Sequence, residues 1–516
     1  MKKLSFVLGL LSLTTLSIAQ DSAAVKFART ITAEDLKQHL SVLASDEYEG
    51  RETGKKGQKM AAEYIRAFFV SNKLNPPTKD GYLQPYDILF ENPTDVSLRL
   101  GQHNLTYLED FFVFGSVGNY TTYEGFDFRG YGIDDEKYSD FTNDKEHDVA
   151  VIINGEPKDN VGRSLVSGKV EAGPWTNDRN KKKDVLLKEG YKLCIVIMPD
   201  FDKWAGMYGH YLTQEKTKLA SKKEENVLPT IYISEKTAAK IFTGKNSLEK
   251  LNKKLLKKNR IPTFSETILV GAGVKGGAKK GQAENVLAIV EGSDLINEIV
   301  IVTAHYDHIG TEGEEVFNGA DDDGSGTVAV MELAQAFKMA KNAGNGPRRT
   351  MVFMAVSGEE KGLLGSEYYT SNPIFPLENT VTNLNIDMIG RVDEQHEGNP
   401  DYIYLIGSDK LSTELHALSE EAGKEYGLLE LDYTFNDPND PNRFYYRSDH
   451  YNFAKNNIPV IFYFNGVHAD YHKSTDTIEK IDFEKMEKIS RLIFHTAWKV
   501  ANADKRPTVD VENDFE

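Results

Sequence analysis

The sequence predicts an α/β fold, a mostly parallel, mixed sheet flanked by helices, into which a second, α+β domain is inserted. Three observations support this. Apolar runs typical of buried strands alternate with helical segments between residues 283 and 505. A stretch with short strands of its own and long charged loops, residues 121–265, interrupts the chain before them. With 516 residues, the chain is also too long for one average domain.

The main domain can be assigned element by element. Its predicted strands are NVLAIV, residues 299–302, TMVFMAVS, LNIDMI, YIYLI and PVIFYF. They are apolar throughout, as expected of parallel strands that helices cover on both faces. Helical spacing is found over residues 327–341, 411–426 and 484–501, and upstream over 32–43 and 58–70. We therefore assign residues 20–120 to the N-terminal part of the same domain.

Both ends of the sequence are expected to lie outside these domains. Lys2 and Lys3 precede an apolar segment that ends in small residues near residue 19, which predicts a signal peptide over residues 1–19. That segment is short for a bilayer span and no later stretch could cross one, so we expect export to the periplasm or medium without membrane insertion. The acidic tail, residues 506–516, is expected to be disordered.

Composition excludes several classes of site and partner. Cys194 is the only cysteine, so the chain has no internal disulfide and no cysteine-ligated zinc cluster. A net charge of −18 argues against nucleic acid as a partner, because binding phosphates requires a concentrated positive face. The lysine-rich residues 245–260 have leucines at helical spacing and predict a surface helix. Any bound metal must therefore be held by His, Asp and Glu.

The predicted strand at residues 299–302 leads into a cluster of ionisable side chains. His305, Asp307 and His308 follow directly, and three adjacent aspartates, residues 321–323, lie in the glycine-flanked turn GADDDGSG. Adjacent carboxylates repel one another unless they are solvated or face a cation. His305 and Asp307 share one face of an extended chain, so the carboxylate could orient the imidazole while its other nitrogen binds a metal. The two halves together predict a metal site.

Three further strands in this region end in side chains of the same kind. They lead to Glu359 and Glu360, to Asp387, and to Tyr471, His472 and Asp476. Taken singly, each could be a solvated loop, a helix cap or a surface histidine. At the carboxyl edge of an open α/β sheet, however, these loops converge. Imidazoles with carboxylates suit zinc at an open site, and two ions roughly 3.5–4 Å apart would share one bridging carboxylate.

The ordered motifs AHYDHIG, GADDDGSG, SGEEKGLLGS, NIDMIGR, RSDHYNFAKNNIPVIFYF and DYHKSTDT resemble the aminopeptidase-Y and bacterial leucyl-aminopeptidase family of co-catalytic zinc peptidases. The resemblance covers about 200 residues of the C-terminal half. SDEYEGRETGKKG also looks like part of longer members, and the insert resembles a protease-associated domain. The resemblance implies a zinc-exopeptidase fold, a peptide or protein substrate, and hydrolysis by a water bridging two zinc ions.

Carried over by position, the resemblance implies five metal ligands. His305 and Asp387 would bind one zinc ion, Glu360 and His472 the other, and Asp322 would bridge the two. No departure from the family pattern occurs at these positions.

The resemblance also implies roles for four other residues. Glu359 would be the general base, and Asp307 the partner that orients His305. Tyr471 would stabilise the oxyanion, and Arg447 occupies a position that can touch substrate.

Three other interpretations stay open. A carboxypeptidase would need cations for the terminal carboxylate of its substrate, for which Arg391 and Arg447 are candidates. Glutaminyl cyclases on this scaffold typically carry Trp before the last histidine ligand, where this chain has Tyr471. A receptor-like protein that binds calcium structurally is disfavoured by His305 and His472, because calcium prefers oxygen ligands. Side-chain specificity and oligomeric state do not follow from the sequence.

Overall fold

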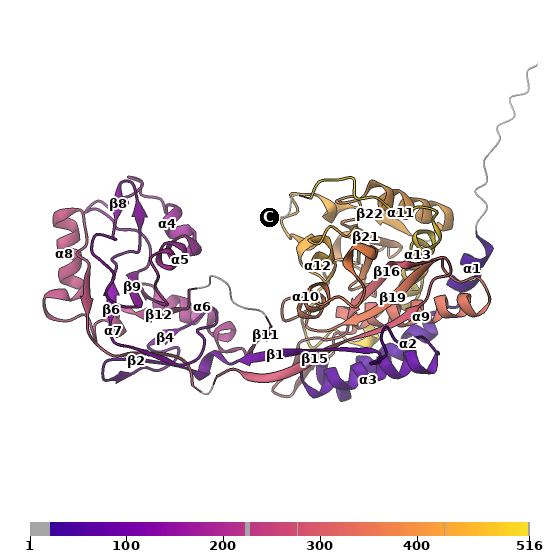
Figure 1. Cartoon of the computed structure of the whole chain (residues 1–516), viewed down its shortest axis with the longest axis horizontal. Helices are drawn as coiled ribbons and strands as arrows, with labels where there is room; N and C mark the ends of the chain where they lie inside the picture. Colours follow the sequence, from indigo (N-terminus) through magenta and orange to yellow (C-terminus); the bar gives the residue numbers. More distant parts are fainter. Residues whose placement is uncertain (1–20, 222–227, 276, 428, 514–516) are drawn as a thin grey trace, which may run out of the picture. The chain divides into compact units, whose positions relative to one another are not determined.

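The computed structural model describes residues 21–221, 228–275, 277–427 and 429–513, so the predicted signal peptide lies outside the described residues. The chain divides into two compact units (Figure 1). One comprises Met1–Tyr86 and Gln282–Glu516, as far as these ranges are described, and the other is Asp87–Gly281. The chain passes between them in strands β1 (Leu83–Glu91) and β15 (Lys279–Val290).

A twisted mixed sheet forms the centre of the first unit. Within this unit its order is β1, β15, β19 (Arg349–Val356), β16 (Leu295–His305), β20 (Thr380–Ile386), β23 (Val460–Phe464), β21 (Tyr402–Ile406) and β22 (Glu430–Asp432). A ninth strand, β11 (Lys216–Leu219), pairs with the part of β1 that belongs to the second unit. The strands from β19 to β23 in this order run parallel, whereas β15 and β21 are antiparallel to their neighbours in that block. The four parallel strands therefore present all their carboxyl ends at one edge.

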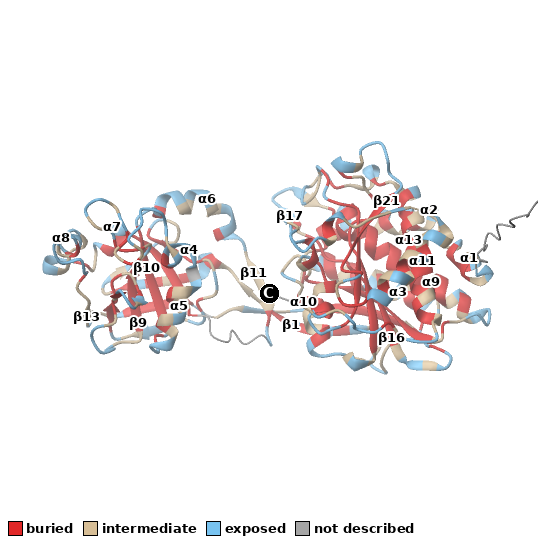
Figure 2. Cartoon of the chain, turned by 90° about the horizontal axis from the view of Figure 1, so that it is seen from above, coloured by how far each residue is buried: buried red, intermediate tan, exposed pale blue. Residues whose placement is uncertain are grey.

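Helices cover both faces of this sheet. The helices α1 (Ser22–Ala28), α2 (Ala33–Leu43), α3 (Lys56–Ser71), α9 (Gly326–Asn342), α11 (Thr413–Tyr426) and α13 (Phe483–Asn502) contribute to one core. The shorter α10 (Leu364–Ser371) and α12 (His450–Ala454) belong to the other. Along β16, Val300 and Val302 enter the first core and Ile299 and Ile301 the second, which explains its unbroken apolar sequence. Figure 2 shows buried residues, in red, in the central part of this sheet.

The second unit has a parallel centre of its own. Its six-stranded sheet has the order β13 (Phe264–Glu266), β6 (Phe126–Phe128), β9 (Val149–Ile153), β10 (Leu193–Met198), β12 (Thr230–Ser234), β4 (Phe111–Phe112). The strands from β6 to β12 are parallel, and the two edge strands are antiparallel. The helices are α4 (Pro174–Asn177), α5 (Arg179–Lys188), α6 (Phe201–Thr213), α7 (Glu235–Ala238) and α8 (Leu248–Lys258).

The inserted unit is longer at both ends than the predicted residues 121–265. A second sheet of four strands accounts for the difference, in the order β3 (His103–Asn104), β2 (Val96–Leu100), β14 (Val270–Val274), β5 (Thr121–Tyr123). Strand β14 pairs with β2 across about 170 residues of chain, from Val270 to Leu100. Residues 87–120 thus belong to the insert and not to the main domain.

The acidic tail is ordered as far as Asn513, contrary to the expectation of disorder. The Asp510 carboxylate accepts a hydrogen bond from the N–H of Thr413 at 2.8 Å, at the start of α11. Thr508 donates to Glu414 from both its N–H and its hydroxyl. The tail therefore caps a helix N-terminus, where negative charge is stabilising. Among the described helices, none is long and apolar enough to cross a membrane.

Candidate metal centre

The ionisable residues that follow the parallel strands meet at one edge of the sheet. His305 ends β16, Asp387 follows β20, and Glu359 and Glu360 follow β19, while His472 lies in the loop after β23. Asp322 is brought to the same place by the turn before α9, whose residues 320–325 are all buried. The structure thus assembles all five predicted ligands and the predicted base.

Asp322 lies at the centre of the cluster. One carboxylate oxygen, Oδ1, is 3.2 Å from His305 Nε2, and the other, Oδ2, is 3.1 Å from His472 Nε2. Asp387 Oδ1 is 3.6 Å from the same nitrogen of His305, and Glu360 Oε2 is 3.4 Å from that of His472. The two oxygens of Asp322 therefore face the two ligand pairs that the sequence predicts, as a bridging carboxylate requires.

His308 also belongs to the cluster, although the resemblance implies no role for it. Its Nδ1 lies 2.8 Å from Glu360 Oε1 and 3.9 Å from Asp322 Oδ2. The ring is fully buried, and its position after the strand in AHYDH was the available signal. His308, Asp322 and Glu360 offer ligand atoms that lie close enough to hold one ion, and His305, Asp323 and Asp387 form a second such group.

Asp323 is engaged with the backbone. Its Oδ2 accepts from the N–H of His305 at 3.1 Å, and its Oδ1 accepts from those of Gly326 and Met388 at 2.9 and 3.0 Å. These bonds join the turn to the ends of β16 and β20. Asp323 therefore fixes the position of its neighbours, and its oxygens are already used.

The partner of His305 differs in one atom from the expectation. The main-chain carbonyl oxygen of Asp307 lies 3.1 Å from His305 Nδ1, whereas the nearest oxygen of its carboxylate lies at 3.8 Å. The carboxylate accepts instead from the Thr53 hydroxyl at 2.6 Å and from the N–H of Glu359 at 3.2 Å. Asp307 thus orients the imidazole through its backbone and the loop of Glu359 through its side chain.

Arg51, in the segment SDEYEGRETGKKG, binds the backbone around the centre through its buried side chain. It is 1% exposed and donates to the carbonyl oxygens of Leu43, Tyr306, Asn318 and Gly319 at 2.6–2.9 Å. Burial lowers the pKa of its guanidinium, which the nearby carboxylates oppose. A cation held near several buried carboxylates stabilises their ionised forms.

Asp476 holds the aspartate turn by its backbone. Its Oδ2 accepts from the N–H of Asp321 at 2.9 Å and from that of Asp322 at 3.2 Å. Asp321 in turn accepts from Gly390 N–H at 2.6 Å and lies 3.2 Å from His468 Nε2. The sequence pointed to Asp476 only as one of several polar residues after a strand. The structure makes it a positioning residue for the bridging carboxylate.

The pKa values of two carboxyl groups in the centre are shifted in opposite directions. Burial opposes ionisation of Asp322, but hydrogen bonds from His305 and His472 outweigh it and hold the pKa of this carboxyl well below its usual range. Burial, with the neighbouring carboxylates of Glu360 and Asp387, raises the pKa of Glu359 well above the usual value, although His305 opposes this. Asp322 is thus suited to bind a cation and Glu359 to exchange a proton.

Tyr471 and Arg447 border the open side of the centre. The phenol oxygen of Tyr471 lies 3.4 Å from Arg447 Nη2, and its ring stacks on His472 with centroids 3.9 Å apart. Burial, then the charges of Asp322 and Glu360, raises the pKa of Tyr471, so the phenol keeps its proton for donation. A cavity of about 30 Å³ lies beside the ligands, lined by Met388, Phe444, Phe462, Phe464 and Val467. An adjoining cavity of about 410 Å³ shares Phe444, Val467, Arg447 and Tyr471.

The chemistry of the donor set fits two divalent metal ions. In the two ligand pairs, four carboxylate oxygens from Asp322, Asp387 and Glu360 lie 3.1–3.6 Å from the two Nε2 atoms of His305 and His472. So many carboxylates in a buried cluster repel one another unless they face a cation. Imidazoles and carboxylates without a thiolate suit zinc. The residues present can therefore hold the ions that the resemblance implies.

The buried ring of His450, near this centre, predicts acid sensitivity. It stacks on Phe462 with centroids 4.6 Å apart, and burial lowers its pKa to about 3. The unfolded chain therefore binds a proton that the folded chain does not as the pH falls below about 6.5, and stability is lost. At pH 4.5 this amounts to about 3 kcal/mol in the free energy of unfolding. Urea unfolding in EDTA should show that His450→Phe loses less stability between pH 7.5 and 4.5 than wild type. Equal losses would contradict the assignment.

Comparison with known proteins supports this description. Residues 285–497 match the model of Peptidase family M28. A probable zinc metalloprotease of Pyrenophora teres f. teres is 29% identical over 262 residues, which cover 43% of this chain and 52% of that protein. Aminopeptidase YwaD of Bacillus subtilis is 27% identical over 233 residues, covering 44% of this chain and 46% of that one. The chain thus spans about half the length of these curated relatives.

A solved structure shares the fold over a longer stretch. An aminopeptidase from Aneurinibacillus sp. strain AM-1 superposes with a TM-score of 0.53, over 95% of this chain and 98% of that one. At 17% sequence identity, this establishes similarity of fold alone.

Proposed function

Since residues 285–497 match the model of Peptidase family M28, we propose that the chain is an exported di-zinc aminopeptidase that removes N-terminal residues from peptides. One observation supports the proposal most strongly. The two carboxylate oxygens of Asp322 face His305 and His472 at 3.2 and 3.1 Å, with Glu359 beside them. This arrangement suits hydrolysis better than structural metal binding, because Glu359 is a partly buried carboxyl that is not needed as a ligand and is available for proton transfer.

The residues of the centre would have three kinds of role: metal binding, proton transfer and stabilisation of the oxyanion. His305, Asp387, Glu360, His472 and Asp322 would hold two zinc ions, which, when bound, lower the pKa of water and polarise the scissile carbonyl. Glu359 takes the proton of the attacking water and passes it to the leaving amine, for which its raised pKa is suited. Tyr471 donates a hydrogen bond to the oxyanion that develops.

Features around the centre favour an aminopeptidase over the alternatives. Arg391, one of the two cations a carboxypeptidase could use, donates to Asp470 at 2.9 Å and lies 3.8 Å from Asp476. Its positive charge is therefore already paired with carboxylates of the protein. Tyr471 occupies the position where cyclases of this scaffold carry Trp. Carboxylates such as Glu359 beside the open cavity also suit the free ammonium group of a peptide N-terminus.

The cavity beside the ligands predicts an apolar first residue in the substrate. Phe444, Phe462, Phe464, Met388 and Val467 line it, and Phe444 and Val467 also line the adjoining cavity of about 410 Å³. The larger cavity has room for an aliphatic side chain, whose burial is worth about 1.5–3 kcal/mol. Peptides that begin with leucine or phenylalanine should accordingly be better substrates than those that begin with aspartate.

A defined peptide pool analysed by mass spectrometry tests the function. The pool contains free, N-acetylated and C-amidated peptides and peptides with N-terminal glutamine, and is incubated with zinc-loaded protein. Release of single residues from free N-termini alone is the expected result. Trimming from free C-termini would indicate a carboxypeptidase, and loss of ammonia from glutamine a cyclase. Unchanged peptides with zinc bound would refute a peptidase.

Removing the charge of the bridging residue should disrupt metal binding. In Asp322→Asn, we expect at least about 100-fold weaker zinc binding and fewer than two zinc ions per chain, because one side chain serves both ligand pairs. Equilibrium dialysis followed by metal analysis measures both quantities. Asp294→Asn is the matched control, since Asp294 is a surface residue paired with Arg348. Two tightly bound ions in Asp322→Asn would disprove the bridging role.

A further inference from the structure

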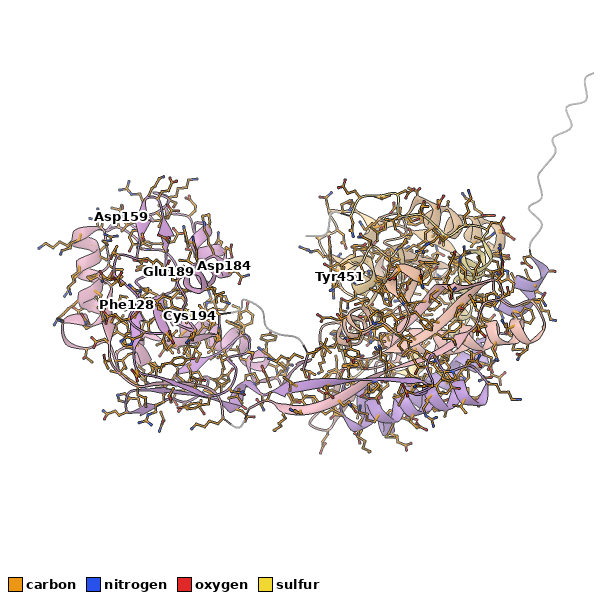
Figure 3. All side chains as sticks on the ribbon, in the orientation of Figure 1. Phe128, Asp159, Asp184, Glu189, Cys194 and Tyr451 are labelled. Atoms are coloured by element: carbon orange, nitrogen blue, oxygen red, sulfur yellow. The ribbon has the colours of Figure 1, made fainter. Side chains whose placement is uncertain are left out.

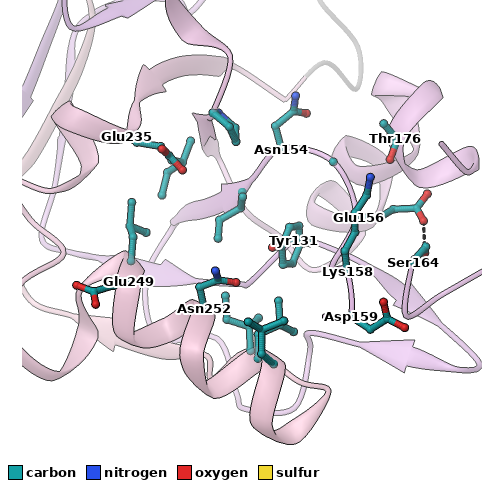
Figure 4. Close-up of a pocket in the computed structure, with 18 of the residues that line it drawn as sticks. Tyr131, Asn154, Glu156, Lys158, Asp159, Ser164, Thr176, Glu235, Glu249 and Asn252 are labelled. Carbon is teal, nitrogen blue, oxygen red and sulfur yellow. Dashed lines mark hydrogen bonds between the residues drawn. The ribbon is translucent and has the colours of Figure 1, made fainter. Parts of the chain in front are cut away.

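The insert contains a large cavity at the carboxyl edge of its own parallel strands (Figure 4). Its volume is about 880 Å³. The lining residues follow the three strands β9, β10 and β12: Asn154 and Glu156 follow β9, Pro199 follows β10, and Glu235 follows β12. Ligand sites in open α/β sheets form at this edge, and they typically measure about 300–1,000 Å³. The rule that locates the metal centre therefore locates a second candidate site.

The cavity combines an apolar wall with an excess of negative charge. Helix α8 contributes Leu248, Leu255 and Leu256, and Phe242 and Ile261 adjoin them. The charged lining residues are five carboxylates and one ammonium group, from Glu156, Asp159, Glu171, Glu235, Glu249 and Lys158. Figure 4 shows Glu235 and Glu249 on one side and Asp159 and Glu156 on the other. Such a lining is complementary to a cation with apolar neighbours.

Within the described residues, part of this negative charge has no ion-pair partner. Asp159 pairs with Arg163 at 3.0 Å and Glu249 with Lys253 at 2.5 Å. For the other three carboxylates the lining offers one cation, Lys158, and the buried Lys182 adds a second positive charge near Glu156.

Among these carboxylates, Glu156 is buried and lacks a hydrogen-bond donor for one of its oxygens in the described part of the chain. It is only 7% exposed, and its Oε2 accepts from Ser164, but its Oε1 has no hydrogen-bond partner within the described residues. The buried ammonium of Lys182 donates instead to the carbonyl oxygen of Gly155. A buried carboxylate oxygen without a donor favours a ligand that brings one.

From these observations we propose that the cavity binds a peptide segment in which a lysine or arginine is flanked by apolar side chains. The cationic group would meet the carboxylate of Glu156, Glu235 would add negative charge across the cavity, and the flanking side chains would pack on Phe242 and the leucines of α8. This site lies wholly within the insert and does not depend on the proposed peptidase activity.

Calorimetric titration of the full chain with blocked peptides tests the proposal. The probe is an N-acetylated, C-amidated tetrapeptide with one lysine among leucines, which has no free terminus for an exopeptidase. A norleucine peptide, a glutamate peptide and spermidine serve as controls. We expect the lysine peptide to bind at least about 10-fold more tightly than each of them. Equal binding of the norleucine peptide would remove the role of charge, and equal binding of spermidine would replace the peptide by a polyamine; either overturns the proposal.

Two substitutions locate the binding. Glu156→Gln removes the buried charge, and Glu235→Lys reverses an exposed one without touching the core. Both should weaken binding of the lysine peptide at least about 10-fold. The controls, Glu189→Gln and Glu189→Lys, change an exposed glutamate of the same unit that does not line the cavity (Figure 3). They should bind like wild type. Unaltered binding in Glu235→Lys would place the peptide elsewhere and refute the site.

Activity measured alongside separates this proposal from the proposed function. Glu235→Lys should hydrolyse a leucine anilide at the wild-type rate while it loses the blocked peptide. If wild type proves inactive on anilides but binds the blocked peptide, the peptidase assignment fails and the cavity assignment stands.

Discussion

Replacing Glu359 by glutamine is expected to reduce turnover by about 100- to 10,000-fold, the range that a positioned general base contributes. Glutamine keeps the size and packing of the side chain but cannot accept a proton. Because Glu359 is not one of the five proposed ligands, both zinc ions should stay bound. Release of leucine from a leucine peptide, measured together with zinc content, gives both quantities.

Glu378→Gln makes the same chemical change on an exposed residue and should leave turnover unaltered. If Glu359→Gln kept its zinc and near-normal turnover, the proton would have to be carried by another group. The assignment of Glu359 would then be wrong, although the metal ligands would be unaffected.

Replacing Arg51 by methionine is expected to lower the free energy of unfolding by about 3–5 kcal/mol. Methionine fills a similar space, but four carbonyl oxygens lose their donor and the carboxylates of the centre lose a buried cation. Urea unfolding in EDTA measures the effect without a contribution from metal binding.

Arg66→Met is the matched control for this substitution. Arg66 lies on α3 and pairs at 2.6 Å with the exposed carboxylate of Glu63, and an ion pair of this kind contributes only about 0–1 kcal/mol. If Arg51→Met were no less stable than Arg66→Met, the guanidinium would have no supporting role.

Much of the centre could be predicted because its signals are local. His305, Glu359 and Asp387 each follow an apolar run, and on parallel strands such positions share one edge whatever the order of the strands. The Asp322 turn is recognisable from its flanking glycines. The fold class follows from the same alternation of strands and helices.

The residues that support the centre could not be found in this way. Arg51 and Thr53 lie more than 250 positions before the groups near the centre that they bind, and nothing in the residues around them indicates that distance. The same holds for the carbonyl of Asp307, since periodicity describes side chains and not backbone atoms. The boundaries of the insert could not be predicted from the sequence, because β2, β5 and β14 are short and gain their stability from long-range pairing.

The metal centre is built from residues that precede the insert in the sequence and residues that follow it, from Arg51 to Asp476, which lies shortly before the last helix. During synthesis, the ligands and their supports therefore come together only after Asp476 has been made. A nascent or truncated chain that stops earlier lacks the carboxylate that holds the Asp322 turn. Such a chain should have no competent centre, so activity would arise late, when most of the polypeptide has already been synthesised.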